Sequence, residues 1–331
     1  MLRNTRITLA AAAALLSTVA AHAEWLPERP VEFIVASGAG GGTDNFARTI
    51  QSIVTKHNLM EQPIVVLNKG SGSGAEAFIY AKANAGDPHK LIFGTNNVYL
   101  LPHVAKLAYT TEDLAPVAAL ALDEFLIWVK ADSEYKDAKS LIEAAKANPG
   151  QIPFGGSQSK DTDETLVALI EQETGADFKY VPFNGGGEVG VQLAGGHIAA
   201  NVNNPNENLG QWQGAAIRPL CVFSPERMAK GEPIQGDQGW SDIPTCSEAG
   251  LPIESYQMPR TVWAPAGLPE EALAFYSDLL KKVSETPEWK DYLAKTSQTG
   301  RFLAGSEFED FIAKSQDNAL KVFKAEGWLV Q

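Results

Sequence analysis

Four short loops rich in glycine, serine and threonine contain the residues of this sequence that are best suited to binding a ligand. The first reads SGAGGGTD, at 37–44, and it joins the apolar run VEFIVA to a segment whose apolar residues have helical spacing. Glycine lets the backbone approach a bound group closely. The first turn of a helix presents unpaired N–H groups and the positive end of the helix dipole. This loop is therefore predicted to bind an anion.

Three further loops have the same chemistry, and each follows a run with β-strand character. They read KGSGSG at 69–74, GTNN at 94–97 and GSQSKDT at 156–162. In an open α/β sheet, the loops at the carboxyl ends of the strands line the ligand crevice. Together the four loops predict a site for a small anion such as a carboxylate.

Nucleotide-binding patterns fit these loops poorly. A P-loop requires G-x-x-x-x-G-K-[ST], but no lysine follows the glycines of the first loop, and the dinucleotide pattern G-x-G-x-x-G fails at Thr43. Cysteine and histidine are few and widely separated, without CxxC or HxxxH spacing, and such spacing is typical of metal sites. We therefore expect neither a cofactor nor a metal.

A secreted serine hydrolase that uses a loop serine is the alternative from a different class. The loops contain no G-x-S-x-G turn, and the sequence indicates no histidine partner for Ser157 or Ser159. No pair of acidic residues has a spacing that marks general acid–base chemistry. The sequence therefore predicts a binding protein and not an enzyme.

The first 23 residues have the pattern of a secretion signal. Two arginines precede an apolar run at about 7–20, and Ala21-His22-Ala23 has the small residues of a cleavage site. The run is too short and too rich in alanine to be a good membrane span. We predict an exported chain that begins at Glu24.

The exported part would be acidic. The signal holds two arginines and no acid, which leaves 25 basic against 40 acidic residues, a formal net charge of −15. Such a surface repels nucleic acid and anionic lipid, but backbone dipoles can still make a site locally positive. Cys221 and Cys246 lie in this part. Export permits a disulfide without requiring one, so their pairing is left open.

The length predicts two lobes, because the roughly 308 residues after the signal exceed one comfortable core. The apolar runs VEFIVA, PIVVLN and KLIFG alternate with helical patterns, and a new unit begins at FLIWVK. Repeated strand–loop–helix units predict a parallel or mostly parallel sheet. The predicted fold class is therefore α/β, with a second lobe at about 124–256.

The residues described so far resemble the extracytoplasmic solute-binding receptors of tripartite tricarboxylate transporters, the TctC-like or Bug-type family. The resemblance covers essentially the whole chain after the signal, and its specificity lies in the order and spacing of the motifs. These motifs are RPVEFIVASGAGGGTDNFAR, NKGSGSGAEAF, FGGSQSKDTDETL, VPFNGGGEVGVQLAGGHI, IRPLCVFSPERM, DIPTCSEAGLP and WAPAGLP.

The resemblance implies a fold like that of type II periplasmic binding proteins, with two α/β lobes and an interdomain ligand cleft. The first lobe would comprise 24–123 and 257–331, and the second 124–256. The resemblance also implies a periplasmic monomer that captures a small organic acid, a di- or tricarboxylate, and delivers it to large and small membrane subunits of the transporter. An aromatic carboxylate or an amino acid is the alternative ligand.

The loops and the resemblance together place ligand-binding residues in both lobes. The predicted residues are Ser37, Gly40, Gly41, Gly42, Thr43, Asp44, Gly72, Ser73, Thr95, Asn96, Ser157, Ser159, Thr162, Asn184, Gly185, Asn204 and Arg260. Asp44 is expected to cap the following helix beside the ligand. Asp161, where the family commonly has glycine, would repel a second carboxylate or pair with a cationic group. Arg260 would clamp a carboxylate with two hydrogen bonds or form a surface ion pair.

Overall fold

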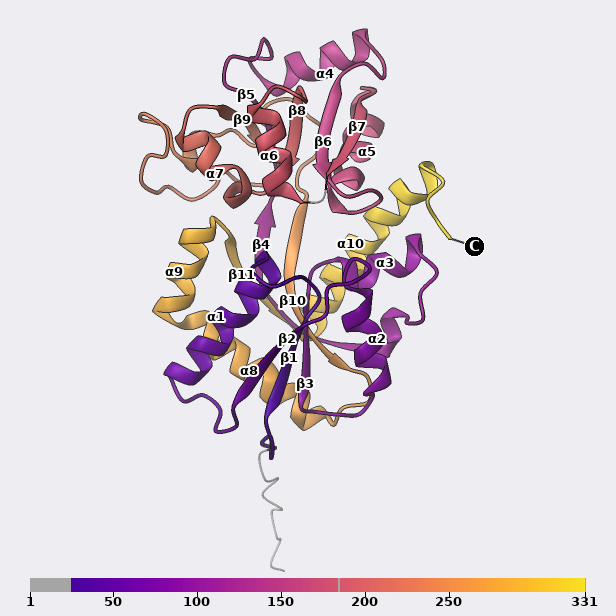
Figure 1. Ribbon diagram of the computed structural model, residues 1–331, viewed down its shortest axis with the longest axis vertical. Coiled ribbons are helices and arrows are strands. Elements are labelled where there is room, and N and C mark those ends of the chain that lie inside the picture. Colours follow the sequence, from indigo (N-terminus) through magenta and orange to yellow (C-terminus); the bar gives the residue numbers. More distant parts are fainter. Residues whose placement is uncertain (1–24, 184, 331) are drawn as a thin grey trace, which may run out of the picture.

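The chain folds into two α/β lobes that lie end to end, as the computed structural model shows for residues 25–183 and 185–330 (Figure 1). Lobe 1 is built on a six-stranded sheet with the strand order β11-β4-β10-β3-β1-β2. Lobe 2 is built on a five-stranded sheet with the order β7-β6-β8-β5-β9. The predicted signal segment and Asn184 lie outside the described residues.

Lobe 1 is made from the first and last parts of the described chain. Its strands are β1 (Val31–Val35), β2 (Ile64–Asn68), β3 (Lys90–Gly94), β4 (Leu114–Glu124), β10 (Gln257–Pro265) and β11 (Thr299–Ala304). Its helices are α1 (Gly42–Lys56), α2 (Ala75–Ala83), α3 (Asn97–Val104), η1 (Thr111–Asp113), α8 (Glu270–Glu285), α9 (Pro287–Thr296) and α10 (Gly305–Ala325).

Lobe 2 is made from the middle of the chain. Its strands are β5 (Leu126–Lys130), β6 (Pro153–Ser157), β7 (Lys179–Phe183), β8 (Ala200–Asn203) and β9 (Ile217–Val222). Its helices are α4 (Ala138–Ala147), α5 (Thr162–Thr174), α6 (Gly186–Ala194), α7 (Pro205–Gln213) and η2 (Trp240–Asp242). Within 25–183 and 185–330, no helix combines the length and apolar character needed to cross a membrane.

Apolar residues on both faces of β1 explain why lobe 1 has helices on two sides of its sheet. Phe33 belongs to one buried cluster with Phe46 of α1, whereas the next residue, Ile34, belongs to another with Phe78 of α2. Neighbouring side chains of a strand point to opposite faces. Full burial of a residue such as Phe46 contributes about 2–3 kcal/mol. This packing fixes α1 on the sheet and so holds the first glycine-rich loop at the carboxyl end of β1.

The prediction of a mostly parallel sheet is wrong. β1 runs parallel to β2 and β3, and β6 runs parallel to β7 and β8. The remaining strand pairs are antiparallel, and each of them includes β4, β5 or β10. β5 runs opposite to β8 and β10 runs opposite to β3, whereas β4, as the antiparallel neighbour of β10, runs in the same direction as β3. The reversed strands β5 and β10 separate the parallel pairs from the rest of each sheet.

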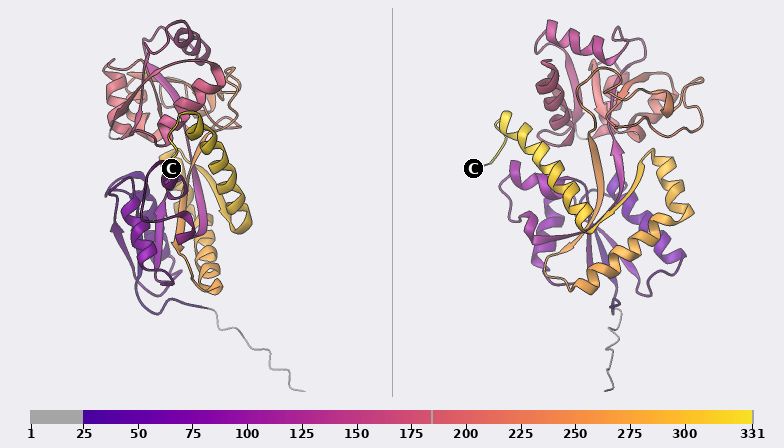
Figure 2. Two further views of the ribbon diagram at one scale, coloured as in Figure 1. Left: turned by 90° about the vertical axis from the view of Figure 1, so that its right-hand side faces the viewer. Right: turned by 180° about the vertical axis from the view of Figure 1, so that it is seen from behind.

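Two adjacent strands connect the lobes, and we call β4 and β10 the hinge strands. β4 ends at Glu124 and β5 begins at Leu126, while β10 pairs with β4 along its whole length. The chain end beyond α10 also reaches lobe 2, where Gln172 Nε2 of α5 donates to Glu326 Oε1 over 3.0 Å (Figure 2). The lobe boundaries given in the sequence analysis, 24–123 with 257–331 for the first lobe and 124–256 for the second, stay a prediction.

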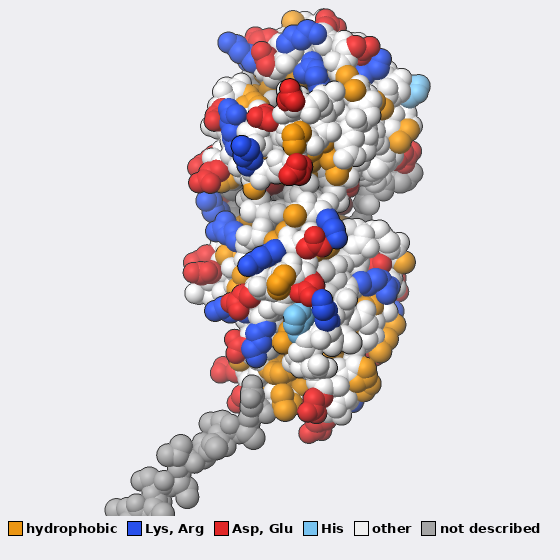
Figure 3. All heavy atoms as spheres, turned by 90° about the vertical axis from the view of Figure 1, so that its left-hand side faces the viewer, with side chains coloured by type: hydrophobic (Ala, Val, Ile, Leu, Met, Phe, Trp, Pro, Cys, Tyr) orange, Lys and Arg blue, Asp and Glu red, His pale blue; other side chains and the backbone are white. Residues whose placement is uncertain are grey.

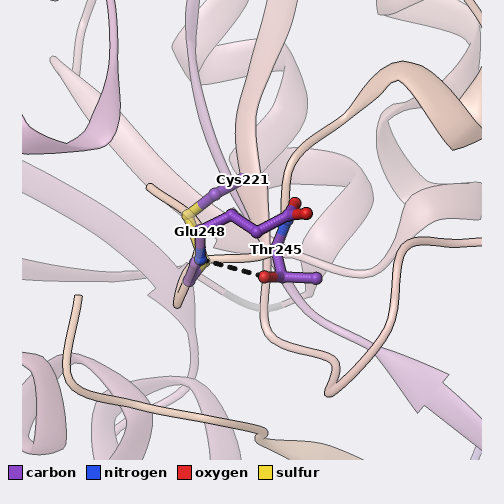
Figure 4. The surroundings of a disulfide bond; sticks show 4 residues. Cys221, Thr245 and Glu248 are labelled. Atoms are coloured by element: carbon purple, nitrogen blue, oxygen red, sulfur yellow. Dashed lines mark hydrogen bonds between the residues drawn. A yellow bond between two sulfur atoms is a disulfide. The ribbon is translucent and has the colours of Figure 1, made fainter. Parts of the chain in front are cut away.

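Cys221 and Cys246 form a disulfide, so the pairing that the sequence leaves open does occur (Figure 4). The bridge joins the end of β9 to the segment that follows η2, and both cysteines are fully buried. Beside it, the Glu248 N–H donates to Thr245 Oγ1 over 3.0 Å. The bridge therefore anchors both ends of a mostly exposed excursion of the chain to the core of lobe 2.

Removing the disulfide is expected to destabilise the protein. In the chain-entropy account, a bridge between residues 25 positions apart contributes about 3 kcal/mol. We expect Cys221→Ala combined with Cys246→Ala to lower the free energy of unfolding in urea by about this amount. Reductant should lower the stability of the native chain and leave that of the double variant unchanged. An unchanged urea midpoint in the double variant would contradict this account.

Candidate functional site

Asp44 fixes the shape of the first glycine-rich loop. Its carboxylate accepts hydrogen bonds from the Gly40 N–H at 2.8 Å, Asn68 Nδ2 at 2.9 Å and Arg48 Nε at 2.9 Å. Burial alone would raise the pKa of Asp44, but these hydrogen bonds lower it below its ordinary value. The N-cap of α1 is Gly41, so the prediction that Asp44 is the cap is wrong. Its carboxylate turns back to hold the loop, which leaves the first turn of α1 without a side-chain cap.

Arg260 lies against that uncapped first turn. Its Nη1 donates to Thr43 Oγ1 over 3.0 Å, and its Nη2 forms an ion pair with Asp123 of β4. A Cβ added to Gly42 would lie 2.8 Å from Nη2, so glycine is needed for this approach. Arg260 is buried, with 7% of its surface exposed, and its Nε has no hydrogen-bond partner among the described residues. The expectation of a surface ion pair is therefore wrong, and a buried cation reinforces the positive end of α1.

The amino-terminal ends of α2 and α3 are also uncapped by side chains. The N-cap of α2 is Gly74, in the left-handed region with φ 91°, and the N-cap of α3 is Asn96. Asn97 joins the two loops, because its Nδ2 donates to the Ser73 carbonyl over 2.8 Å and its Oδ1 accepts from Thr95 Oγ1 over 3.0 Å. The Thr95 hydroxyl is therefore used within the loop, where it positions Asn97.

Loops from the two lobes are in contact at these helix ends. Ser73 Oγ donates to Gln158 Oε1 over 3.0 Å, and Thr162 Oγ1 donates to Asn96 Oδ1 over 3.2 Å. Beside them, a cavity of about 10 Å³ lies between α3, α5 and α10. A cavity of this size holds about one water molecule. The amino-terminal ends of α3 and α5 thus face each other where the two lobes are in contact.

The GSQSKDT loop of lobe 2 differs from the first loop in the charge it carries. Asp161 is the N-cap of α5 and accepts from the Thr162 N–H over 2.8 Å, while Asp163 accepts from the Ser157 N–H over 2.7 Å. Glu164 accepts from the Lys160 N–H. Burial raises the pKa values of Asp161 and Asp163 above their ordinary range. The backbone donors of this loop are thus largely used by its own carboxylates.

Glu207 lies beside the predicted residues Gly185 and Asn204, and the sequence reasoning did not name it. Its Oε2 accepts from the N–H of Asn204, the N-cap of α7, over 3.2 Å. A Cβ added to Gly186, in the first turn of α6, would lie 2.1 Å from Oε2, so the carboxylate packs directly on that turn. The spacing Asn-Pro-Asn-Glu at 204–207 is a capping-box signal and marks the helix start. It does not reveal that the same carboxylate meets α6.

Acidic residues also lie at the end of hinge strand β4. Glu124 is fully buried, and it accepts from Gln257 Nε2 of β10 at 2.7 and 2.9 Å and from Thr299 Oγ1 at 2.7 Å. Burial raises the pKa of Glu124 to about 7. Asn204 Nδ2 donates to the Glu124 carbonyl over 2.8 Å. The predicted ligand residue Asn204 therefore has a structural role at the hinge.

The structure gathers the described members of the predicted site into three groups. The first, around α1, contains Ser37, Gly40, Gly41, Gly42, Thr43, Asp44 and Arg260. The second, where α2 and α3 meet the GSQSKDT loop, contains Gly72, Ser73, Thr95, Asn96, Ser157, Ser159 and Thr162. The third, at the starts of α6 and α7, contains Gly185 and Asn204. Asn184 lies outside the described residues.

Two lobes on paired hinge strands, with helix amino-terminal ends facing each other between them, define a solute-binding protein of the hinged, two-lobed class. The chain belongs to the family described as "Tripartite tricarboxylate transporter family receptor" (TctC), whose sequence profile matches residues 46–327. This confirms the family predicted from the sequence motifs. The family consists of solute-binding receptors and is not an enzyme family.

Individual relatives agree with this assignment. The chain is 28% identical over 94% of its length to "UPF0065 protein in gbd 5'region" of Cupriavidus necator, of which it covers 92%. It resembles a TctC solute-binding protein from Polaromonas with a TM-score of 0.75 and 25% identity, over 90% of this chain and 99% of that one. It also resembles Rpa4515 of R. palustris, solved with adipate, with a TM-score of 0.75 and 25% identity, over 91% and 98% of the two chains. These likenesses confirm the predicted fold class.

The stability of the protein should depend on the charge of Glu124. A carboxyl whose pKa is about 7 in the folded state and 4.5 ordinarily contributes stability that is lost as the pH rises through this interval, on the order of 3 kcal/mol. We expect the free energy of unfolding in urea to fall between pH 5 and 8, and Glu124→Gln to make this fall smaller. Glu143→Gln, on the exposed face of α4, is the control. An equal fall in the native chain and Glu124→Gln would contradict the assignment.

Proposed function

We propose that this chain is a periplasmic receptor that captures a small organic acid and delivers it to the large and small membrane subunits of a tripartite tricarboxylate transporter. The observation that carries the proposal is the uncapped first turn of α1 with the buried Arg260 guanidinium beside it. Backbone N–H groups, a helix dipole and a cation converge there, and each favours a carboxylate. The predicted signal segment supports export, and the receptor acts as a monomer.

The ligand carboxylate would be bound by the backbone of 41–43, with the Nε of Arg260 as a further donor. Gly72, Ser73 and Asn96 are at the neighbouring helix ends of lobe 1, and the GSQSKDT loop closes on them from lobe 2. Asp44 and Thr95 then act as positioning residues, since their side chains are engaged within their own loops. Contacts to both lobes let the ligand favour the closed state of the hinge strands.

The family description supports a carboxylate as the ligand. The structure of Rpa4515 supports it too, because that protein was solved with adipate, a dicarboxylate. The distribution of charged side chains on the surface is also compatible with a small carboxylate ligand. Basic and acidic side chains are interspersed over the face of the molecule in Figure 3. A small anion would therefore be selected by the local site and not by a broad basic surface.

A serine hydrolase has less support. Ser157 donates its N–H to Asp163, and the hydroxyl of Tyr180 donates to the Ser157 carbonyl. The described histidines with assigned partners face other groups: His57 contacts Glu288, His89 contacts Asp87, and His103 contacts Gln316. Neither these hydrogen bonds of Ser157 nor these histidine contacts would activate a serine hydroxyl as a nucleophile.

The proposal predicts saturable binding of a carboxylate without turnover. The purified chain without its signal would be titrated by calorimetry with succinate, malate, citrate, adipate, glutamate and nicotinate, and each ligand would be recovered and analysed. We expect at least one to bind with micromolar or tighter affinity and to be recovered unchanged. Conversion of a panel member, or failure of all of them to bind, would overturn the proposal.

The variant Gly42→Ala tests the place of binding in the same experiment. Its Cβ displaces the Arg260 guanidinium from the first turn of α1, so we expect about tenfold weaker binding, which is about 1.4 kcal/mol. Gly210→Ala in α7, where a Cβ meets nothing within 4 Å, is the matched control and should bind like the native chain.

A further inference from the structure

Helices α3 and α10 of lobe 1 are fixed to each other and form one support beside lobe 2. The Tyr99 hydroxyl of α3 donates to Ser315 Oγ of α10 over 3.0 Å. Farther along, Gln316 Nε2 lies 2.7 Å from His103 Nε2, and the Val330 N–H donates to the His103 carbonyl over 2.9 Å. The chain end is thereby tied to α3. Figure 2 shows that α10 leaves the sheet of lobe 1 and reaches the level of lobe 2.

Helix α5 of lobe 2 contacts this support near both of its ends. At its first residue, Thr162 Oγ1 donates to Asn96 Oδ1 at the start of α3 over 3.2 Å. Near its last residue, Gln172 Nε2 donates over 3.0 Å to Oε1 of Glu326, which directly follows α10. The two contacts are about 15 Å apart along the helix, at a rise of about 1.5 Å per residue. We call the contact of α5 with α3 and α10 the interlobe seam.

Side chains fill the seam between these two polar contacts. Phe323 of α10 has only 1% of its surface exposed. It lines the small cavity of about 10 Å³ together with Leu100 of α3 and Thr165 of α5, so residues of both lobes pack around a space for about one water molecule. Moving α5 away from α3 and α10 would expose apolar surface here, and burial of that surface favours the closed arrangement.

We propose that the interlobe seam holds the two lobes together and sets the closing equilibrium, so that residues outside the ligand loops tune ligand affinity. A rotation at the hinge strands moves α5 relative to both α3 and α10, and the seam therefore stabilises the closed state only. If the closed state is the one that holds the ligand, the apparent dissociation constant rises as its populated fraction falls. Gln172 and Glu326 then act on affinity through the hinge. The inference goes beyond the proposed function and requires no particular carboxylate.

The acidic surroundings of Gln172 make this residue the sharpest place to disturb the seam. Its partner Glu326 interacts unfavourably with Glu171, the preceding residue of α5, and Asp177 and Glu164 add further negative charge around Glu171. The neutral amide of Gln172 is a donor to Glu326, whereas a carboxylate at this position would repel it. The substitution Gln172→Glu is therefore expected to separate the end of α5 from the end of α10.

The experiment measures the distance between spin labels on the two lobes by pulsed electron paramagnetic resonance, in the chain without its predicted signal. Ser52→Cys on α1 and Val191→Cys on α6 provide exposed label sites. The labels attach only there, because Cys221 and Cys246 are joined to each other. With no carboxylate added, we expect Gln172→Glu to move population from a shorter to a longer distance. Identical distance distributions with and without this substitution would overturn the inference.

A second substitution and a matched control separate the seam from a general effect of charge. Gln172→Glu combined with Glu326→Lys places opposite charges at the same contact and should restore the shorter distance. Gln151→Glu adds the same charge at an exposed turn of lobe 2 beyond α4 and should leave the distances as in the native chain. Distances that stay long in the combined variant, or that lengthen equally in Gln151→Glu, would speak against the seam.

Calorimetry with the carboxylate that binds the native chain most tightly then tests the effect on affinity. We expect Gln172→Glu to weaken binding about threefold, as is typical of a charge contact at the surface, and the combined variant to recover the native affinity. Unchanged affinity in Gln172→Glu would overturn the claim that the seam tunes binding. The distance measurement needs no ligand, so failure of every carboxylate to bind would overturn the proposed function and leave the seam to be decided by the distances.

Discussion

A buried guanidinium against the positive end of a helix is the interaction on which the rest of this site depends. Arg260 contacts Thr43 and approaches Gly42 at the first turn of α1, where the helix dipole disfavours a cation. Asp123 offsets part of that cost, and a bound anion would offset the remainder. Because Arg260 and Asp123 are both buried, their charges interact more strongly than they would on the surface. In a chain with a formal net charge of −13, the guanidinium and the start of α1 are thus two groups at one place that favour an anion.

The same ion pair links the site to the hinge. Asp123 and Glu124 end β4, while Arg260 and Gln257 lie on the adjacent β10, so the residues that position the guanidinium belong to the strands that connect the lobes. Any ligand that changes the balance between Asp123 and Arg260 also acts on the hinge strands. Binding and closure are therefore expected to be coupled by contacts at this point, without a separate relay.

The sequence predicts those parts of the site that depend on neighbouring residues. The glycine-rich loops, the strands before them and the helices after them follow from local composition. The partners of Arg260 and Glu124 do not, because they come from strands far apart in the sequence, whose pairing depends on the whole sheet. Likewise, the capping box at 204–207 marks the start of α7, but the packing of Glu207 on Gly186 depends on how α6 meets α7. The error about parallel strands has the same origin, since local pattern carries no information on where the chain crosses between lobes.

The most direct test of the central claim is the amide NMR spectrum of the chain without its predicted signal during titration with the carboxylate that binds most tightly in the calorimetric panel. If backbone N–H groups at the start of α1 hold the carboxylate, the amide resonances of Gly42 and Thr43 should shift strongly and saturate with the binding curve. Amides in α4, on lobe 2 away from the hinge strands, should stay in place. Saturable binding that leaves Gly42 and Thr43 unshifted would contradict the account.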